Sequence, residues 1–321
     1  MQNPIRSGSR HFALHQLADG MFTAIAENGG AAISNSGIMD LGGKIIVYDS
    51  FLTPQSAMDL RQITENMFGQ TPEIVVNSHY HNDHIWGNQA FTPETQIISS
   101  TRTRELIETA GKEEVQWYLA NSAQKLEEFR SQYQNTHDEQ ERGQLTLWIG
   151  YYEGLVEAMP YLSVRVPSIT FNDRLNIYGS KHSAELINFE FAHTESDTVL
   201  YLPKAGIVLM SDLLFVDCHP YLADGNPLKL LNALNVLKQL DATYFVPGHG
   251  PVGTIDDLKL FIEYIEFCME TAQILVNEGN TNDDRIMKLK LPEKYVHWTM
   301  SSFFYTNIRF LCHRLNSASR D

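Results

Sequence analysis

Three histidines and one aspartate lie within six consecutive residues, His79-Tyr80-His81-Asn82-Asp83-His84, and this motif limits the possible fold more than any other segment. The preceding run, Ile74–Val76, is apolar and β-branched, which predicts a short buried strand ending just before the motif. Side chains alternate along extended backbone, so His79 and His81 are expected to point the same way. Three imidazoles and a carboxylate suit a cation such as zinc better than an apolar core. The motif therefore predicts a metal site.

Three more residues of ligand type follow apolar runs that the pattern predicts to be strands. They are His193 after Ala184–Ala192, Asp212 after Ile207–Met210, and His249 after Ala242–Val246. Open α/β sheets place their binding sites at the carboxyl ends of strands. Each residue alone could be an ordinary polar loop residue. Four such placements in one chain, counting the motif, indicate a shared metal site.

The remaining pattern predicts an α/β chain. Strands and tight turns alternate through the first hundred residues, and strand patterns return after residue 160. Between them, at about 100–160, apolar side chains recur at three- and four-residue steps, which predicts an inserted helical hairpin. A long amphipathic pattern predicts a C-terminal helical segment at about 254–321. No linker-like composition separates these parts, so we expect a single domain over residues 1–321.

The order of these residues resembles that of the metallo-β-lactamase-fold hydrolases: HxHxDH, a histidine after a strand, a strand-terminal aspartate, and Gly-His-Gly at 248–250. The resemblance covers nearly the whole chain except the insertion and the last forty residues, and it implies a four-layer αββα sandwich with metals at one edge between the sheets. It implies two divalent metal ions, zinc before iron or manganese. It also implies their ligands: His79, His81 and His193 for one ion, Asp83, His84 and His249 for the other, and Asp212 as the bridge.

The resemblance further implies a hydrolase. A metal lowers the pKa of bound water to about 7, so a hydroxide bridging two zinc ions can attack substrate without a serine or cysteine nucleophile. Asp83 and Asp212 are the carboxylates expected to take part in catalysis. Lactamases of this fold usually carry Cys or Ser at the position of Asp212, so we expect a small ester, lactone, thioester or amide as substrate. The alternatives are a phosphodiesterase or nuclease on the same site, a mononuclear iron oxygenase, and a binding protein without catalysis.

Five further residues are candidates for supporting roles. Asp49 and Asp197 follow strands or ligands, and each could orient a ligand histidine through its second ring N–H. A turn or capping role is the equally plain alternative for both. Tyr80, His219 and Tyr221 lie in or after the ligand loops and are candidates for substrate contact.

Composition limits the partners and the compartment. The chain has 24 Lys+Arg and 39 Asp+Glu, a net charge of −15, which disfavours binding to nucleic acid. No apolar run reaches the ~18 residues of a membrane span, and Met1–Arg10 lacks the apolar segment of a secretory signal. We therefore expect a cytoplasmic enzyme acting on a small molecule, with no membrane partner. The insertion has more aromatic residues than a hairpin can bury alone, which makes it a candidate contact for a homo-oligomer.

Overall fold

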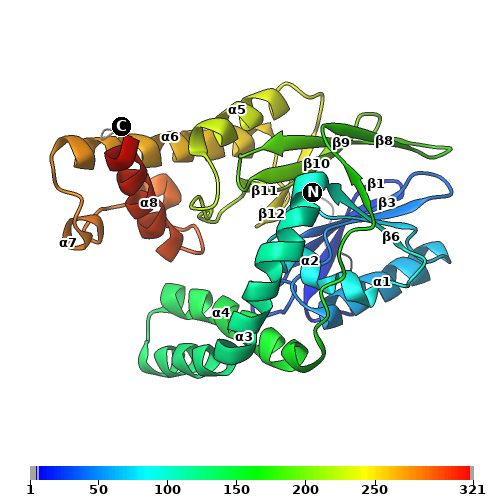
Figure 1. Ribbon diagram of the computed structural model, residues 1–321, viewed down its shortest axis with the longest axis horizontal. Helices are drawn as coiled ribbons and strands as arrows, with labels where there is room; N and C mark the ends of the chain where they lie inside the picture. The colour runs from blue at the N-terminus through cyan, green and yellow to red at the C-terminus, as the bar shows by residue number, and fades with distance from the viewer. Residues whose placement is uncertain (1–4, 6, 319–321) are drawn as a thin grey trace.

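The computed structural model describes residue 5 and residues 7–318, and it consists of two β-sheets that pack face to face with helices on both outer faces (Figure 1). This arrangement confirms the predicted α/β class and the αββα sandwich with an inserted helical hairpin. The last residues of the predicted C-terminal segment, 319–321, lie outside the described part of the chain.

The first sheet has seven strands in the sequential order β1-β2-β3-β4-β5-β6-β7. The first four strands pair antiparallel, and the remaining pairs are parallel. Parallel pairing makes β4, β5 and β6 end at the same edge, which is where β5 delivers the histidine motif. The strands are β1 (Phe12–Ala18), β2 (Met21–Ala26), β3 (Ser36–Asp40), β4 (Ile45–Tyr48), β5 (Ile74–Val76), β6 (Gln96–Ser100) and β7 (Ile169–Phe171).

The second sheet has five strands in the order β12-β11-β10-β9-β8, of which only β11 and β12 pair in parallel. The strands are β8 (Arg174–Tyr178), β9 (Ser183–Glu190), β10 (Ser196–Leu202), β11 (Ile207–Phe215) and β12 (Tyr244–His249).

Strand β11 continues past Met210, where the sequence pattern predicts its end. Its register with β12 shifts on both sides of Ser211, whose φ is 47°. The strand bends there but keeps its pairing as far as Phe215 opposite His249. Asp212 therefore lies inside an irregular strand rather than after its end, which corrects the prediction.

Apolar side chains from both sheets form the central core, for example Ile46 and Val76 from the first sheet and Leu200 and Leu209 from the second. Helix α1 covers the outer face of the first sheet, α5 and α6 cover the outer face of the second, and α8 packs against α6 (Figure 1). The helices outside the insertion are α1 (Pro54–Phe68), α2 (Asn82–Ile85), α5 (Pro227–Leu237), α6 (Ile255–Asn277), α7 (Asp283–Ile286) and α8 (Ser302–Ala318), with short 3-10 turns at Trp86–Ala90, Met159–Tyr161 and Glu293–Tyr295.

The insertion consists of α3 (Thr101–Asn135) and α4 (Glu139–Ala158), which pack against each other as a hairpin below the sheets in Figure 1. Its aromatic rings form a cluster with Trp86 of the sheet domain, and Trp148 also contacts Phe303 of α8. Helix α4 lies so close to the chain at Gly29 that a Cβ at Gly150 would be 2.5 Å from the Gly29 backbone. The insertion therefore packs against both the loop at Gly29, which follows β2 of the first sheet, and the C-terminal helix α8.

Among the described residues, no helix is both long enough and apolar enough to cross a bilayer.

Candidate metal centre

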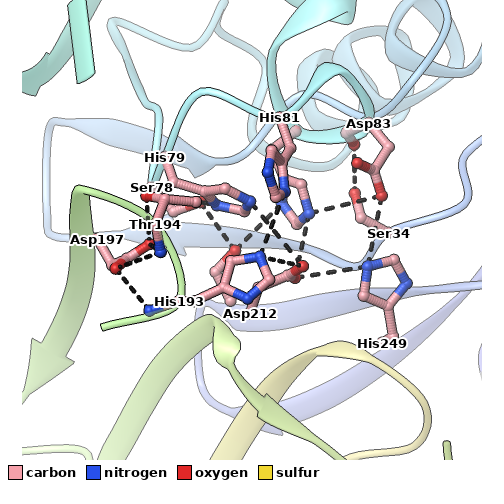
Figure 2. A network of polar contacts seen from close by, with 12 residues as sticks. Ser34, Ser78, His79, His81, Asp83, His193, Thr194, Asp197, Asp212 and His249 are labelled. Atoms are coloured by element: carbon pink, nitrogen blue, oxygen red, sulfur yellow. Dashed lines mark hydrogen bonds and ion pairs between the residues drawn. The ribbon is translucent and has the colours of Figure 1, made fainter. Parts of the chain in front are cut away.

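The structure brings all seven predicted metal ligands together at one edge of the two sheets, although they come from four separate parts of the sequence. Figure 2 labels all of them except His84. His79 follows β5, and His81, Asp83 and His84 lie at the start of or within α2. The other three ligands are contributed by the second sheet: His193 from the turn between β9 and β10, Asp212 from β11, and His249 from the end of β12.

The first group consists of His79, His81, His193 and Asp212, whose ligand atoms all lie within 4.8 Å of one another. His193 Nε2 is 3.2 Å from His81 Nδ1 and 3.3 Å from Asp212 Oδ2. His79 Nε2 is 3.9 Å from the same Asp212 oxygen. Three imidazole nitrogens and one carboxylate oxygen thus face a common point.

The second group consists of Asp83, His84 and His249, which also lie within 4.8 Å of one another. Asp83 Oδ2 is 3.4 Å from His249 Nε2 and 3.6 Å from His84 Nε2. The other oxygen of Asp212, Oδ1, faces this group at 3.2 Å from His84 Nε2 and 3.4 Å from His249 Nε2. Asp212 therefore presents one oxygen to each group, the geometry that a bridging carboxylate requires.

The buried atoms of this cluster have the properties of metal ligands. His79 Nε2, His84 Nε2 and Asp212 Oδ1 are buried and make no hydrogen bond within the described structure. A buried polar atom without a partner costs about 1–3 kcal/mol, and a bound cation would remove that cost. Burial lowers the pKa of His193 to about 3, which keeps this imidazole in the neutral form that binds metals. Imidazole and carboxylate donors fit zinc, and also iron or manganese.

Asp49 holds His84 in place from behind. Its side chain is fully buried, and Oδ2 accepts a hydrogen bond from His84 Nδ1 at 2.8 Å. The hydroxyls of Ser78 and Ser211 donate to the same oxygen at 2.8 and 2.9 Å, and the Ser78 backbone N–H donates to Oδ1 at 2.8 Å. With its Nδ1 proton bound to Asp49, His84 presents Nε2 to the second group, so the contact is the one expected of an orienting carboxylate.

Asp197 has the turn-capping role rather than the role of orienting a ligand histidine. Its carboxylate accepts hydrogen bonds from the backbone N–H of His193 at 2.9 Å and from the backbone N–H and hydroxyl of Thr194 (Figure 2). These contacts fix the turn that carries His193, while no contact joins Asp197 to an imidazole within the described structure. Burial raises the pKa of Asp197 to about 6.

Asp224 is a site residue that the sequence analysis missed. Its Oδ2 accepts a hydrogen bond from His81 Nε2 at 3.0 Å, which turns His81 Nδ1 toward His193. The hydroxyl of Tyr80 also donates to Asp224, at 3.4 Å. Asp224 precedes Gly225 in the connection between β11 and α5, so its local sequence looks like an ordinary turn. The contact with His81, 143 positions away in the sequence, becomes visible only in the folded structure.

A cavity of about 430 Å³ opens beside the ligands, and His81, Asp83, Asp212 and His249 line part of it. The insertion supplies much of the opposite wall. The contributing residues are Glu114 and Tyr118 from α3, and Leu147, Trp148, Tyr151 and Tyr152 from α4. The insertion thus borders the candidate site directly.

The three predicted substrate contacts have different positions. Tyr221 lines the cavity, and Tyr80 supports Asp224 from beside it. His219 lies elsewhere, fully buried among the aromatic rings of the second sheet's outer core, where its Nδ1 lies 2.8 Å from the hydroxyl of Tyr264. Its place after Asp212 in the sequence suggested exposure, but the chain turns inward to pack under α6 and α8.

Comparison with known proteins agrees with this geometry. The family described as "Metallo-beta-lactamase superfamily" matches residues 29–249, which include all seven predicted ligands. No curated protein sequence matches the chain.

Two solved metallo-beta-lactamases are similar in fold. The enzyme from Pontibacter korlensis has 16% identity and a TM-score of 0.57, over 79% of this chain and 99% of its own. The mono-zinc form of FIM-1 from Pseudomonas aeruginosa has 14% identity and a TM-score of 0.55, over 80% and 95%.

The stereoselective inverting sec-alkylsulfatase Pisa1 from Pseudomonas sp. has 16% identity and a TM-score of 0.67, over 96% of this chain but 52% of its own. This chain therefore spans about half the length of that sulfatase. At such identities the three likenesses concern the fold.

Proposed function

The chain belongs to the metallo-beta-lactamase superfamily, and from this we propose that it is a metal-dependent hydrolase that cleaves a small ester, lactone, thioester or amide. One observation carries the proposal: the two oxygens of the buried Asp212 face two separate groups of ligand-type side chains beside a cavity of about 430 Å³. That arrangement suits a pair of divalent ions, and we propose zinc because imidazole and carboxylate ligands predominate.

Ions held by the two groups would supply a water of lowered pKa and an electrophile for the scissile carbonyl. The chain's own residues would position these ions: Asp49 through His84, and Asp224 through His81. Among the described residues that line the two cavities, no activated serine or cysteine nucleophile is present. Cys218 borders an adjoining cavity, but burial raises the pKa of its thiol far above the usual range, which keeps the sulfur protonated. The sequence also lacks a Gly-x-Ser-x-Gly elbow.

The experiment that tests this proposal combines metal analysis with a substrate panel. Purified wild type is expected to contain two equivalents of zinc and to hydrolyse at least one chromogenic ester, thioester, lactone or anilide. Chelation should abolish the activity, and zinc should restore it. Bis-p-nitrophenyl phosphate is included because a phosphodiesterase would be the outcome if only that compound were cleaved.

Asp212→Ala is expected to lose at least one equivalent of metal and about a hundredfold or more in kcat/KM, since it removes one ligand from each group. Asp256→Ala is the matched control, because Asp256 is an exposed aspartate at the start of α6. Unchanged metal content in Asp212→Ala, or a wild type that cleaves nothing in the panel, would refute the proposal.

A further inference from the structure

We propose that the substrate of this site is a small cation, an ester, thioester, lactone or amide that carries an ammonium group, and that Glu114 and the aromatic rings of the insertion bind its positive charge. The inference rests on the proposed function and adds the charge of the substrate to it. The buried Asp212 lines the same cavity, so the proposed ammonium pocket and the proposed reacting centre face one space.

Glu114 of α3 faces the cavity with a carboxylate that, among the described residues, forms no ion pair with a lysine or arginine. Within the described structure its hydrogen-bond donor is Asn82, whose Nδ2 lies 2.8 Å from Oε1, and no ion pair involves it. Burial raises the pKa of Glu114 to about 7, Asp83 and Asp224 add to this rise, and His81 and the hydrogen bond from Asn82 oppose it. A cationic group bound beside it would provide the missing partner.

Asp224 adds a second carboxylate to the same cavity wall. Its Oδ2 is bound to His81, and its side chain is about one-third exposed. Glu114 is fixed to the ligand loop through Asn82, and Asp224 is fixed to it through His81. Both carboxylates therefore occupy defined positions near the metal ligands, although neither belongs to the two ligand groups.

Four aromatic residues of the insertion line the same cavity as Glu114. Tyr118 comes from α3, and Trp148, Tyr151 and Tyr152 come from α4. A chain of hydrogen bonds fixes two of them: Asn82 Nδ2 donates to the hydroxyl of Tyr151 at 3.0 Å, and that hydroxyl donates to Tyr118 at 2.7 Å. Aromatic faces attract ammonium groups, most strongly where water is excluded. Rings combined with a carboxylate are the chemistry that recognises such a group.

Lysine and arginine side chains are missing from both cavities at this site among the described residues, where the basic side chains are the histidines His81, His249 and His297. Among the described residues that line the 430 Å³ cavity there is no lysine or arginine. The same holds for an adjoining cavity of about 350 Å³, which shares Trp148, His249 and Met300 and adds the acids Glu27 and Glu139. A carboxylate or phosphate on the substrate would find no lysine or arginine among these lining residues. The net charge of −15 also favours the approach of a cation.

The test compares two molecules of the same shape, choline and 3,3-dimethylbutan-1-ol, which differ only in the charge of the trimethyl head. Binding to zinc-loaded protein is measured by isothermal titration at about pH 8, above the pKa of about 7 of Glu114. Choline is expected to bind about tenfold or more tightly than the alcohol. Equal affinities of the two compounds, or no binding of choline, would overturn the inference.

Glu114→Gln is expected to reduce the preference for choline to about threefold or less, because it keeps the hydrogen bond from Asn82 but removes the charge. Glu113→Gln is the matched control, an exposed neighbour on the same helix, and should keep the full preference. Tyr152→Leu provides a second variant that leaves the carboxylate intact, and it should weaken choline binding about threefold or more. Preserved preference in both Glu114→Gln and Tyr152→Leu would refute the assigned pocket.

Hydrolysis separates this inference from the proposed function. The kcat/KM of acetylthiocholine is compared with that of its uncharged analogue, S-(3,3-dimethylbutyl) thioacetate. If both are cleaved at the same rate and choline has no binding advantage, the enzyme is a hydrolase and the charge inference is wrong. If choline binds selectively but neither thioester nor any other compound of the panel is cleaved, the pocket stands and the proposed function fails.

Discussion

Replacing Asp49 by asparagine tests how far the metal centre depends on a residue that would not itself touch a metal. Asparagine has the shape of aspartate, but one of its two terminal atoms can only donate hydrogen bonds. In the wild type three groups meet at Asp49 Oδ2: the hydroxyls of Ser78 and Ser211 and the Nδ1 of His84. The two hydroxyls can rotate and become acceptors, whereas a ring N–H cannot.

Neither orientation of the amide satisfies its surroundings. With the NH₂ at the Oδ2 position, His84 must move its proton from Nδ1 to Nε2, the atom that faces the second ligand group. With the amide reversed, the NH₂ meets the backbone N–H of Ser78, whose nitrogen lies 2.8 Å from Oδ1 in the wild type. Loss of such a carboxylate typically lowers metal affinity 10- to 100-fold, or about 1.4–2.7 kcal/mol. We expect Asp49→Asn to weaken the binding of one ion by this amount.

Competition with a chromophoric chelator measures the affinity of each ion, and urea unfolding of the metal-free protein verifies that the variant folds. Ser211→Ala is the comparison, because it removes one donor from Asp49 and the 3.1 Å contact of Ser211 Oγ with His84 Nδ1 but leaves the hydrogen bond between Asp49 and His84 in place. Its metal affinity should fall by about threefold or less. If Asp49→Asn bound both ions with wild-type affinity, or Ser211→Ala lost as much, the orienting role of Asp49 would be wrong.

Two further predictions concern the fold. Gly143→Ala should stabilise the protein by about 0.5–1 kcal/mol, because alanine favours the helix and nothing lies within 4 Å of the new Cβ in α4. Gly150→Ala should destabilise the protein by about 1–3 kcal/mol, because its Cβ would clash with the Gly29 backbone. Urea unfolding measures both changes, and the same sign for both would refute this packing. Burial lowers the pKa of His219 to about 4, so this group favours folding above about pH 6.5 and loses that contribution as the pH falls toward 4. The metal-free wild type should therefore lose about 2–3 kcal/mol more between pH 7 and 4.5 than His219→Phe, which lacks the ionisable ring, and parallel pH profiles would contradict the assignment.

Features that depend on short stretches of sequence were predictable. The apolar run before the histidine motif marked the end of β5, since strand ends are local properties, whereas β12 continues past the predicted end at Val246 and includes His249. The three- and four-residue spacing at about 100–160 likewise predicted the hairpin of α3 and α4. The end of β11 was missed because a strand that bends at Ser211 can stay paired with β12 beyond its apolar run.

The two supporting aspartates show the limit of such reasoning. Asp49 and Asp197 had equal standing in the sequence, yet one contacts an imidazole and the other fixes a backbone turn. The difference arises from which partner the fold brings to each carboxylate. Local residue type cannot reveal it.

By itself, then, the sequence determined which side chains are available: seven residues of types that bind metals, each at or near the end of an apolar run that predicts a strand. The tertiary structure alone decided how Asp212 divides its oxygens between two groups, and which residues border them. Glu114 and Asp224 reach the ligand loop from 32 and 143 positions away. Contacts across such separations depend on how sheets and helices pack, and no local pattern of residues encodes them.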